Sequence, residues 1–216
     1  FADTLAALRE AGAELIEGID LAAGYGPEDR ADALDVMLWE IGPGVAAYID
    51  EYLPAEFPIR SLADVLAFNR DHADEELRWF GQDLLEMAAA KTPLADPEYL
   101  ATAARVQQRA RAAIDTALEV HGLDAIVAPS GSPATRIDLI NGDQRIGGSS
   151  GPSARAGYPT VTVPAGNRFG LPANVSFIGG AFTEATLLRL AYSFEQATHA
   201  RLTPAFAPPG IAPPRD

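Results

Sequence analysis

The chain has 216 residues, of which 48% are hydrophobic, and its formal net charge is −14 at pH 7. This composition indicates a folded globular protein, and the negative charge argues against nucleic acid and anionic membranes as partners. No apolar run reaches the roughly 18 residues that a transmembrane helix needs, and no signal peptide is expected. The absence of cysteine excludes disulfides and thiolate chemistry.

The charge is distributed unevenly along the chain. Residues 1–121 carry 24 acidic and 9 basic residues, whereas residues 122–216 carry 6 and 7. This difference predicts an acidic, solvated helical layer, followed by a nearly neutral region that is rich in proline and glycine.

Residues 1–27 predict a helix–strand unit of an α/β core. Asp3 can cap a helix that ends at Gly12, and the apolar residues of 13–21 are typical of a strand with one buried face. No strand precedes this helix in the chain, although an α/β protein normally has one there.

Residues 28–121 predict the acidic helical layer. Pro27 begins a long helix, which Gly42-Pro43-Gly44 must kink or interrupt, and Trp39 beside this break is expected in the core. The pair Ser61 and Asp64 is typical of a capping box at a second helix start.

The rest of this layer predicts two further helical segments. An apolar stripe from Leu77 to Met87, which includes Phe80, predicts a helix that packs into the core. Asp96 and Pro97 then begin a helix that runs to His121 and ends at Gly122. Its arginines 105, 109 and 111 predict a solvated face with ion pairs.

Residues 122–202 predict the C-terminal strands, the pocket loops and the final helix of the α/β core. The strands are expected in D-A-I-V-A-P, T-V-T-V-P and A-N-V-S-F-I-G-G, and Thr183 begins the final helix. Residues 203–216 form a proline-rich tail that should be extended or disordered.

The fold class is therefore α/β, with about four strands and six helices. Four strands with helices on one side only would leave a parallel-type sheet half covered, which is unfavourable. We therefore expect this chain to be an incomplete part of a larger mixed β-sheet that helices cover.

Residues 147–151 match the G-x-S-x-G pattern of a serine hydrolase, with Ser149 as the nucleophile. Glu184 or Glu195, with His199, would complete the triad in the required order. The motif requires a buried strand before the serine and a long helix after it, and the local sequence predicts neither. This hypothesis is therefore the weakest of those considered.

Other catalytic groups find little support. His72, His121 and His199 lack metal-ligand spacing, and no phosphate-binding glycine motif occurs, so neither a metal nor another cofactor is predicted. Lys91 would act as a base only if it were desolvated, and we expect it on the surface. The hydroxyl-rich loop thus has no evident base to activate a serine.

The order of several segments resembles the C-terminal half of the amidase signature family. The segments are D-A-I-V-A-P-S-G-S-P-A, G-G-S-S-G-P-S-A-R-A-G-Y-P-T-V-T-V-P-A-G and G-L-P-A-N-V-S-F-I-G-G. S-L-A-D-V-L-A-F-N-R-D-H-A and F-G-Q-D-L-L-E are similar to the branch of bacterial peptide amidases. The resemblance covers nearly the whole chain.

The resemblance implies a Ser–cis-Ser–Lys triad that lies in the N-terminal portion of such enzymes. Ser149 and Ser150 do not match that portion, because the sequence after them matches the family's C-terminal strand. No catalytic residue is therefore assigned in this chain. The expected partners are a small-molecule or peptide amide and the missing N-terminal portion of the same enzyme.

The resemblance also implies that the loop after D-A-I-V-A-P lines the substrate pocket. The expected substrate-binding residues are Ser130, Gly131, Ser132, Pro133, Asn141, Gly148 and Ser149. These residues could equally serve only to shape the turns. Trp39, Tyr48 and Phe80 are further candidates for apolar contacts at the entrance. The alternative to an amidase portion is a non-catalytic binding or partner module with the same fold.

Overall fold

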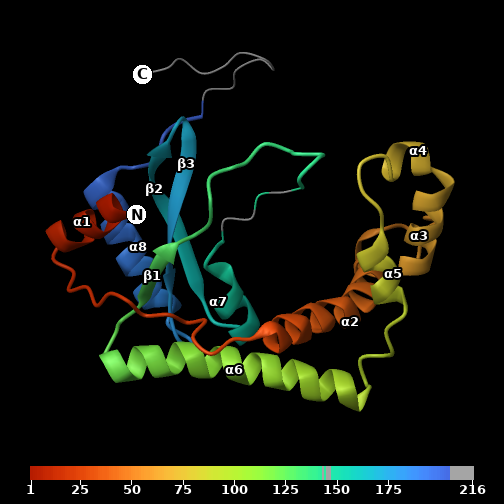
Figure 1. Cartoon of the computed structure of the whole chain (residues 1–216), viewed down its shortest axis with the longest axis horizontal. Helices are drawn as coiled ribbons and strands as arrows, with labels where there is room; N and C mark the ends of the chain where they lie inside the picture. The colour runs from red at the N-terminus through yellow and green to blue at the C-terminus, as the bar shows by residue number, and fades with distance from the viewer. Residues whose placement is uncertain (143, 145–146, 205–216) are drawn as a thin grey trace. The chain divides into compact units, whose positions relative to one another are not determined.

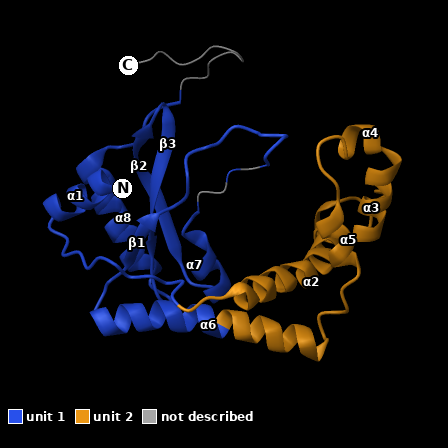
Figure 2. Ribbon diagram, in the orientation of Figure 1, with its two compact units in different colours: residues 1–23, 108–216 blue, residues 24–107 orange. Residues whose placement is uncertain are grey.

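The computed structural model describes residues 1–142, 144 and 147–204. These residues form two compact units, shown in different colours in Figure 2. Unit 1 contains residues 1–23 and 108–216, and unit 2 contains residues 24–107. The division falls within the long helix 97–121, whose second half has its core contacts in unit 1. The tail predicted at 203–216 lies, from residue 205 on, outside the described residues.

Unit 1 contains a three-stranded sheet with the order β1-β3-β2. Strand β1 is Ile126–Pro129, β2 is Thr160–Arg168 and β3 is Leu171–Ile178. Both pairs of strands are antiparallel, and the described residues form three strands where about four were expected. The expected fold class, an α/β arrangement in which helices cover part of a sheet, is confirmed. The three predicted strand segments are confirmed.

Helices cover both faces of this sheet, as a sheet covered by helices requires. Helices α1 (Ala2–Glu10) and α8 (Glu184–Thr198) pack on the face that carries Val175 and Phe177. The second half of α6 (Pro97–His121) and α7 (Ser150–Ala156) cover the face that carries Ile126 and Ile178. Figure 1 shows α8 and α7 on opposite sides of the strands. The short helix α7 was not predicted.

The end of α1 follows the predicted chemistry. Gly12 has φ +93°, its N–H donates to Arg9, and the Ala13 N–H donates to Leu8, which is the hydrogen-bond pattern of a Schellman motif. Its start differs, because Phe1 is the N-cap and Asp3 lies inside the first turn. The strand predicted at 13–21 is absent from the described residues, since no strand pairs with this segment.

Unit 2 is helical and has its own small core. It contains α2 (Pro27–Tyr52), α3 (Leu62–Asp71), α4 (Ala73–Glu76), α5 (Asp83–Ala89) and the first part of α6. Leu38, Leu62, Leu66 and Ala88 are buried together where α2, α3 and α5 meet. Helix α2 continues through Pro43 without a break.

The apolar stripe from Leu77 to Met87 is not the buried helix that was predicted. Helix α5 begins only at Asp83, and Phe80 in the preceding loop is 76% exposed. Within α5, Leu84 and Met87 are about half exposed, and only Ala88 is buried. Polar residues before the stripe allow a short α4 and a loop, so the apolar spacing alone did not decide the structure.

The expected ion pairs of α6 are present in part. The Arg105 Nε donates to Asp32 Oδ2 at 2.8 Å, and this contact lowers the pKa of Asp32. Arg111 instead donates to the Ala156 carbonyl at 2.8 Å and lies over the Tyr158 ring. Within the described ranges, no helix is both long enough and apolar enough to cross a membrane.

The helix start predicted at Ser61 is confirmed, but the Asp64 carboxylate accepts from the N–H of the residue before the N-cap and not from the N-cap itself. The Ser61 Oγ accepts from the Asp64 N–H at 3.2 Å, and the Arg60 N–H donates to Asp64 Oδ2 at 3.0 Å. The backbone N–H of Arg60, followed by the Ser61 hydroxyl, lowers the pKa of the Asp64 carboxyl.

We therefore predict that Asp64→Asn reduces the acid sensitivity of unit 2. A carboxyl whose pKa is lower in the folded state stabilises the fold above its unfolded pKa of about 3.9. That contribution disappears as the pH falls through the folded pKa. Urea unfolding between pH 5 and pH 2.5, followed by the fluorescence of Trp39 and Trp79, measures the effect.

The exposed carboxylate of Glu56 provides the control for this experiment. Glu56→Gln should leave the pH dependence of unfolding unchanged, whereas Asp64→Asn should flatten it below about pH 4. If the free energy of unfolding depends equally on pH in the D64N variant and in the unchanged chain, the Asp64 carboxylate is not the cause of the acid sensitivity.

Candidate functional site

Three hydroxyl groups meet where β1 ends. The Ser130 Oγ lies 2.7 Å from the Ser176 Oγ, and the Thr162 Oγ1 lies 2.9 Å from the same atom. Ser176 and Thr162 are opposite each other in the β2–β3 register, and Ser130 directly follows β1. Ser176 is 3% exposed, so its hydroxyl fixes the two outer hydroxyls on one face of the sheet.

This face changes character along the strands. At one end Ile126 and Ile178 are buried against α6 and α7. Two residues further along β3 the side chain is the hydroxyl of Ser176, because alternate residues of a strand point to the same face. The sheet therefore presents an apolar half, which packs, and a polar half, which can donate to or accept from a ligand.

The loop after β1 is held against the start of α7. The Ser149 N–H donates to the Ser130 carbonyl at 3.3 Å, and Gly131 and Gly148 form an isolated β-bridge. A Cβ at Gly148 would lie 3.2 Å from the Ser130 carbonyl oxygen, so glycine permits this close approach. The structure thus brings together four of the expected site residues: Ser130, Gly131, Gly148 and Ser149.

The other expected site residues lie further along the same loop. Ser132 and Pro133 follow the β-bridge, and Ser132 is exposed. Asn141 belongs to a separate turn, where its N–H and its Nδ2 both donate to Asp138 at 2.9 Å. These bonds lower the pKa of the Asp138 carboxyl. Asn141 thus has a structural role in this turn, independent of any role in binding.

Ser149 carries a buried hydroxyl oxygen without a hydrogen-bond partner among the described residues. An activated serine needs a base within hydrogen-bond reach. His199 caps the end of α8, and its link to Glu195 is a backbone bond of 2.9 Å, which is ordinary helix geometry. The G-x-S-x-G triad is therefore not assembled in this structure.

Lys91 is not the surface lysine that was predicted. Its Nζ lies 2.6 Å from Asp35 Oδ1 and 4.1 Å from the centroid of the Trp39 ring, and its side chain is 22% exposed. Trp39 is buried as expected, and its Nε1 donates to Thr92 at 3.1 Å. The ion pair and the ring contact give Lys91 a structural role within unit 2.

The three aromatic residues proposed for apolar contacts differ in their exposure to solvent. Tyr48 is 61% exposed, and its ring is tilted by 41° against the Tyr52 ring, so it is a surface residue of α2. Phe80 is likewise exposed, whereas Trp39 is buried in unit 2. Among the residues that the structure describes, no group of histidine and carboxylate side chains could hold a metal ion.

Ser176 and Thr162 are the site residues that the sequence interpretation missed. Their signal is a polar residue that alternates with apolar residues along a strand, in N-V-S-F and in T-V-T-V. Such a residue is buried only where a partner satisfies it, so it indicates a hydrogen-bond network on that face. The partner could not be identified before the register of the strands was known.

The chain has extensive similarity to known amidases. It is 31% identical over 204 residues to a protein of Arabidopsis thaliana named as a probable amidase, a match that covers 92% of this chain and 36% of that protein. It superimposes on the peptide amidase from Stenotrophomonas maltophilia with TM-score 0.80 and 36% identity, covering 95% of this chain and 40% of the other.

A third relative is an amidase family protein from Bacillus anthracis. It matches with TM-score 0.73 and 27% identity, covering 95% of this chain and 36% of the other. A scan against models of protein families gives no match. The homology and the shared fold show that this chain belongs to the amidase signature family. The chain spans about two fifths of the length of these relatives.

Proposed function

We propose that this chain forms the C-terminal part of an amidase that hydrolyses a carboxamide C–N bond through an acyl-serine intermediate. The observation that supports this most strongly is the match to a peptide amidase, which covers 95% of this chain but only 40% of that enzyme. The remaining length of the relative is where the family resemblance implies the Ser–cis-Ser–Lys triad.

The chemistry divides between the two portions. A serine of the N-terminal portion attacks the carbonyl carbon, the C–N bond breaks, and the amine leaves with a proton that the lysine-linked network supplies. Water then attacks the ester, releases the acid and returns the serine. The present chain contributes the wall formed by Ser130, Gly131, Gly148 and Ser149, which binds the amide substrate. Ser132 and Pro133 extend this wall, and Asn141 belongs to the same loop.

This role suits the hydroxyl cluster better than nucleophilic catalysis does. Ser176 holds the Ser130 hydroxyl in place, and a fixed hydroxyl can bind a carbonyl or an amide without being deprotonated. Among the described residues the Ser149 hydroxyl has no hydrogen-bond partner, which counts against the alternative of a self-sufficient serine hydrolase. The substrate class we propose is a peptide amide or another small linear amide.

We therefore predict that the 216-residue chain alone does not react with a fluorophosphonate probe. These probes label activated serines, and the Ser149 hydroxyl has no hydrogen-bond partner among the described residues. Peptide mapping by mass spectrometry after incubation would locate any adduct, and intact peptide amidase serves as the positive control. An adduct at Ser149, absent from the S149A variant, would contradict the proposed function.

A further inference from the structure

The three hydroxyl groups of Ser130, Ser176 and Thr162 form a row across the sheet, which we call the hydroxyl row. The Ser176 Oγ is its middle member, and the described residues give this oxygen no third hydrogen-bond partner. Ala128 is opposite Ser176 on β1 but has only a methyl group, so the bond comes from Ser130, two residues further along. The Ser176 side chain is buried, whereas Thr162 is exposed to solvent.

The protons of the hydroxyl row can be arranged in two ways. A hydroxyl carries one proton, so Ser176 can donate to only one of its two neighbours. If it accepted from both, its buried proton would have no acceptor, which is costly. In the first arrangement Thr162 donates to Ser176, Ser176 donates to Ser130, and the Ser130 proton is free for a ligand. In the second arrangement both bonds run the opposite way, and Ser130 offers a ligand only its lone pairs.

Solvent completes both arrangements at the exposed end of the row. The Thr162 hydroxyl accepts from water in the first arrangement and donates to water in the second. Rotation of the three hydroxyl groups converts one arrangement into the other, and no covalent bond breaks. Ser130 can therefore face a ligand either as a donor or as an acceptor.

We propose that Thr162 and Ser176 are positioning residues that let the Ser130 hydroxyl accept from the N–H of an amide substrate and donate to the carboxylate of the product. This inference rests on the proposed function, which assigns Ser130 to the wall that binds the amide. An amide N–H needs an acceptor, whereas an ionised carboxylate has acceptors only. The second arrangement suits the amide, and the first suits the carboxylate.

Replacing Thr162 by valine should hold the row in the first arrangement. Without a hydroxyl at position 162, the buried Ser176 proton has only Ser130 to accept it. Ser130 would then face the ligand as a donor, because the opposite order would leave the Ser176 proton unpaired. The amide N–H would lose its acceptor, and the carboxylate would keep its donor.

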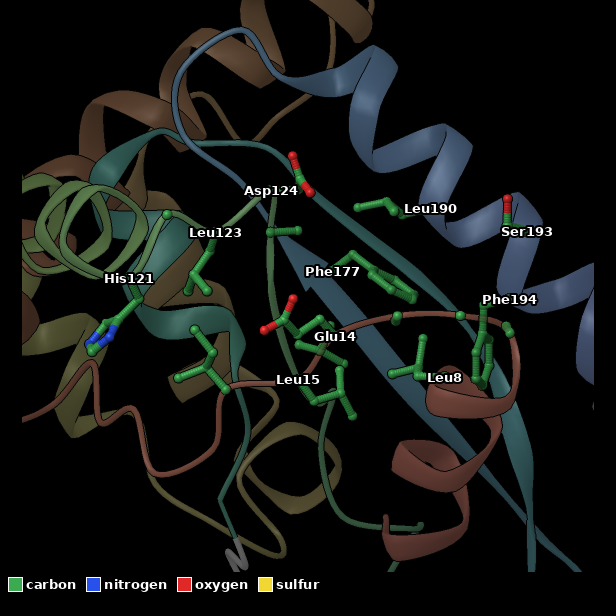
Figure 3. A pocket seen from close by; sticks show the side chains of 17 residues that line it. Leu8, Glu14, Leu15, His121, Leu123, Asp124, Phe177, Leu190, Ser193 and Phe194 are labelled. Carbon is green, nitrogen blue, oxygen red and sulfur yellow. The ribbon is translucent and has the colours of Figure 1, made fainter.

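This substitution leaves the other face of the sheet unchanged. Val161 and Val163, on either side of Thr162, pack into the core that contains Phe177, and alternate residues of a strand point to opposite faces. Figure 3 shows Phe177 and Phe194 beside the hollow of about 550 Å³ on that face. Valine is also favourable in strands. Circular dichroism should therefore show that the Thr162→Val variant folds.

The test uses a hybrid in which this chain is joined to the N-terminal portion of the Stenotrophomonas maltophilia peptide amidase. Hydrolysis of a peptide amide at pH 7 gives kcat and KM, and inhibition by the same peptide with a free carboxylate gives the inhibition constant. We expect Thr162→Val to raise KM by about three- to tenfold, as the loss of one neutral hydrogen bond does, without raising the inhibition constant.

Three further variants separate the hydroxyl row from a general effect on structure. Thr162→Ser keeps the hydroxyl and should keep both constants. Ser176→Ala releases Ser130 from the row and should raise KM and the inhibition constant together. Thr198→Val is the matched control for Thr162→Val, because the Thr198 hydroxyl donates to the Phe194 carbonyl at 2.9 Å in α8. It should change neither constant.

The outcomes separate this inference from the proposed function. If the hybrid hydrolyses the amide, and Thr162→Val raises both constants equally or changes neither, the positioning role is wrong and the function stands. A hybrid that binds the amide without hydrolysing it counts against the function, and calorimetry with the amide and the acid then makes the same comparison through dissociation constants. A hybrid that binds neither ligand would overturn both proposals.

Discussion

Replacing Phe177 by alanine should lower the free energy of unfolding of unit 1 by about 3–5 kcal/mol. The ring is 2% exposed and lies at the centre of the core between the sheet and helices α1 and α8. It contacts the Phe194 ring edge-on, with 6.1 Å between the centroids. Alanine would lose this contact and leave a cavity, because Leu187 and Ala191 on α8 cannot move to fill it without breaking their own packing.

Phe182→Ala is the matched control, because this ring is 94% exposed. Its replacement should change the free energy of unfolding by less than about 0.5 kcal/mol. Urea unfolding followed by circular dichroism measures both variants, since Trp39 and Trp79 lie in unit 2 and do not report directly on unit 1. Equal effects of F177A and F182A would contradict the core described above.

The strands of unit 1 could be predicted from the sequence because local signals agree there. Each is a short apolar run bounded by proline or glycine. Glycine accepts the positive φ at which an element ends, as Gly122 does with φ +62° directly after α6. The helix start at Ser61 was predictable for the same reason, since its hydrogen bonds join residues only three or four positions apart.

The predicted strand at 13–21 failed because a strand depends on its partner. The segment has a suitable apolar pattern, but within the described chain no neighbour completes its hydrogen bonds. The alternation of apolar residues shows which face of a strand could be buried, but it does not show whether a neighbouring strand is present to pair with it. The same limit explains why about four strands were expected where the described residues form three.

The candidate site was predicted in part for a related reason. Ser130 and Ser149 were proposed from one loop, and the structure joins them directly through a backbone hydrogen bond. The hydroxyl of Ser176, which positions Ser130, comes from a strand 46 residues away. That contact follows from the register of β1 with β3, which no local pattern specifies.

The second large effect is expected in a hybrid enzyme, in which this chain is joined to the N-terminal portion of the Stenotrophomonas maltophilia peptide amidase in one polypeptide. If Ser130 binds the amide, then Ser130→Ala should lower kcat/KM by about tenfold, since one hydrogen bond to substrate is lost. Ser149→Ala should lower kcat/KM by no more than about tenfold, since Ser149 is expected only to bind the substrate. Loss of a true serine nucleophile would instead lower kcat by about a millionfold.

The most direct test of the account is therefore the hydrolysis of a peptide amide by four proteins: this chain alone, its S149A variant, the hybrid, and the S149A hybrid. We predict no turnover by the chain alone, turnover by the hybrid, and turnover within about tenfold of that value by the S149A hybrid. Turnover by the chain alone that disappears with Ser149→Ala would contradict the account, and would make Ser149 the nucleophile.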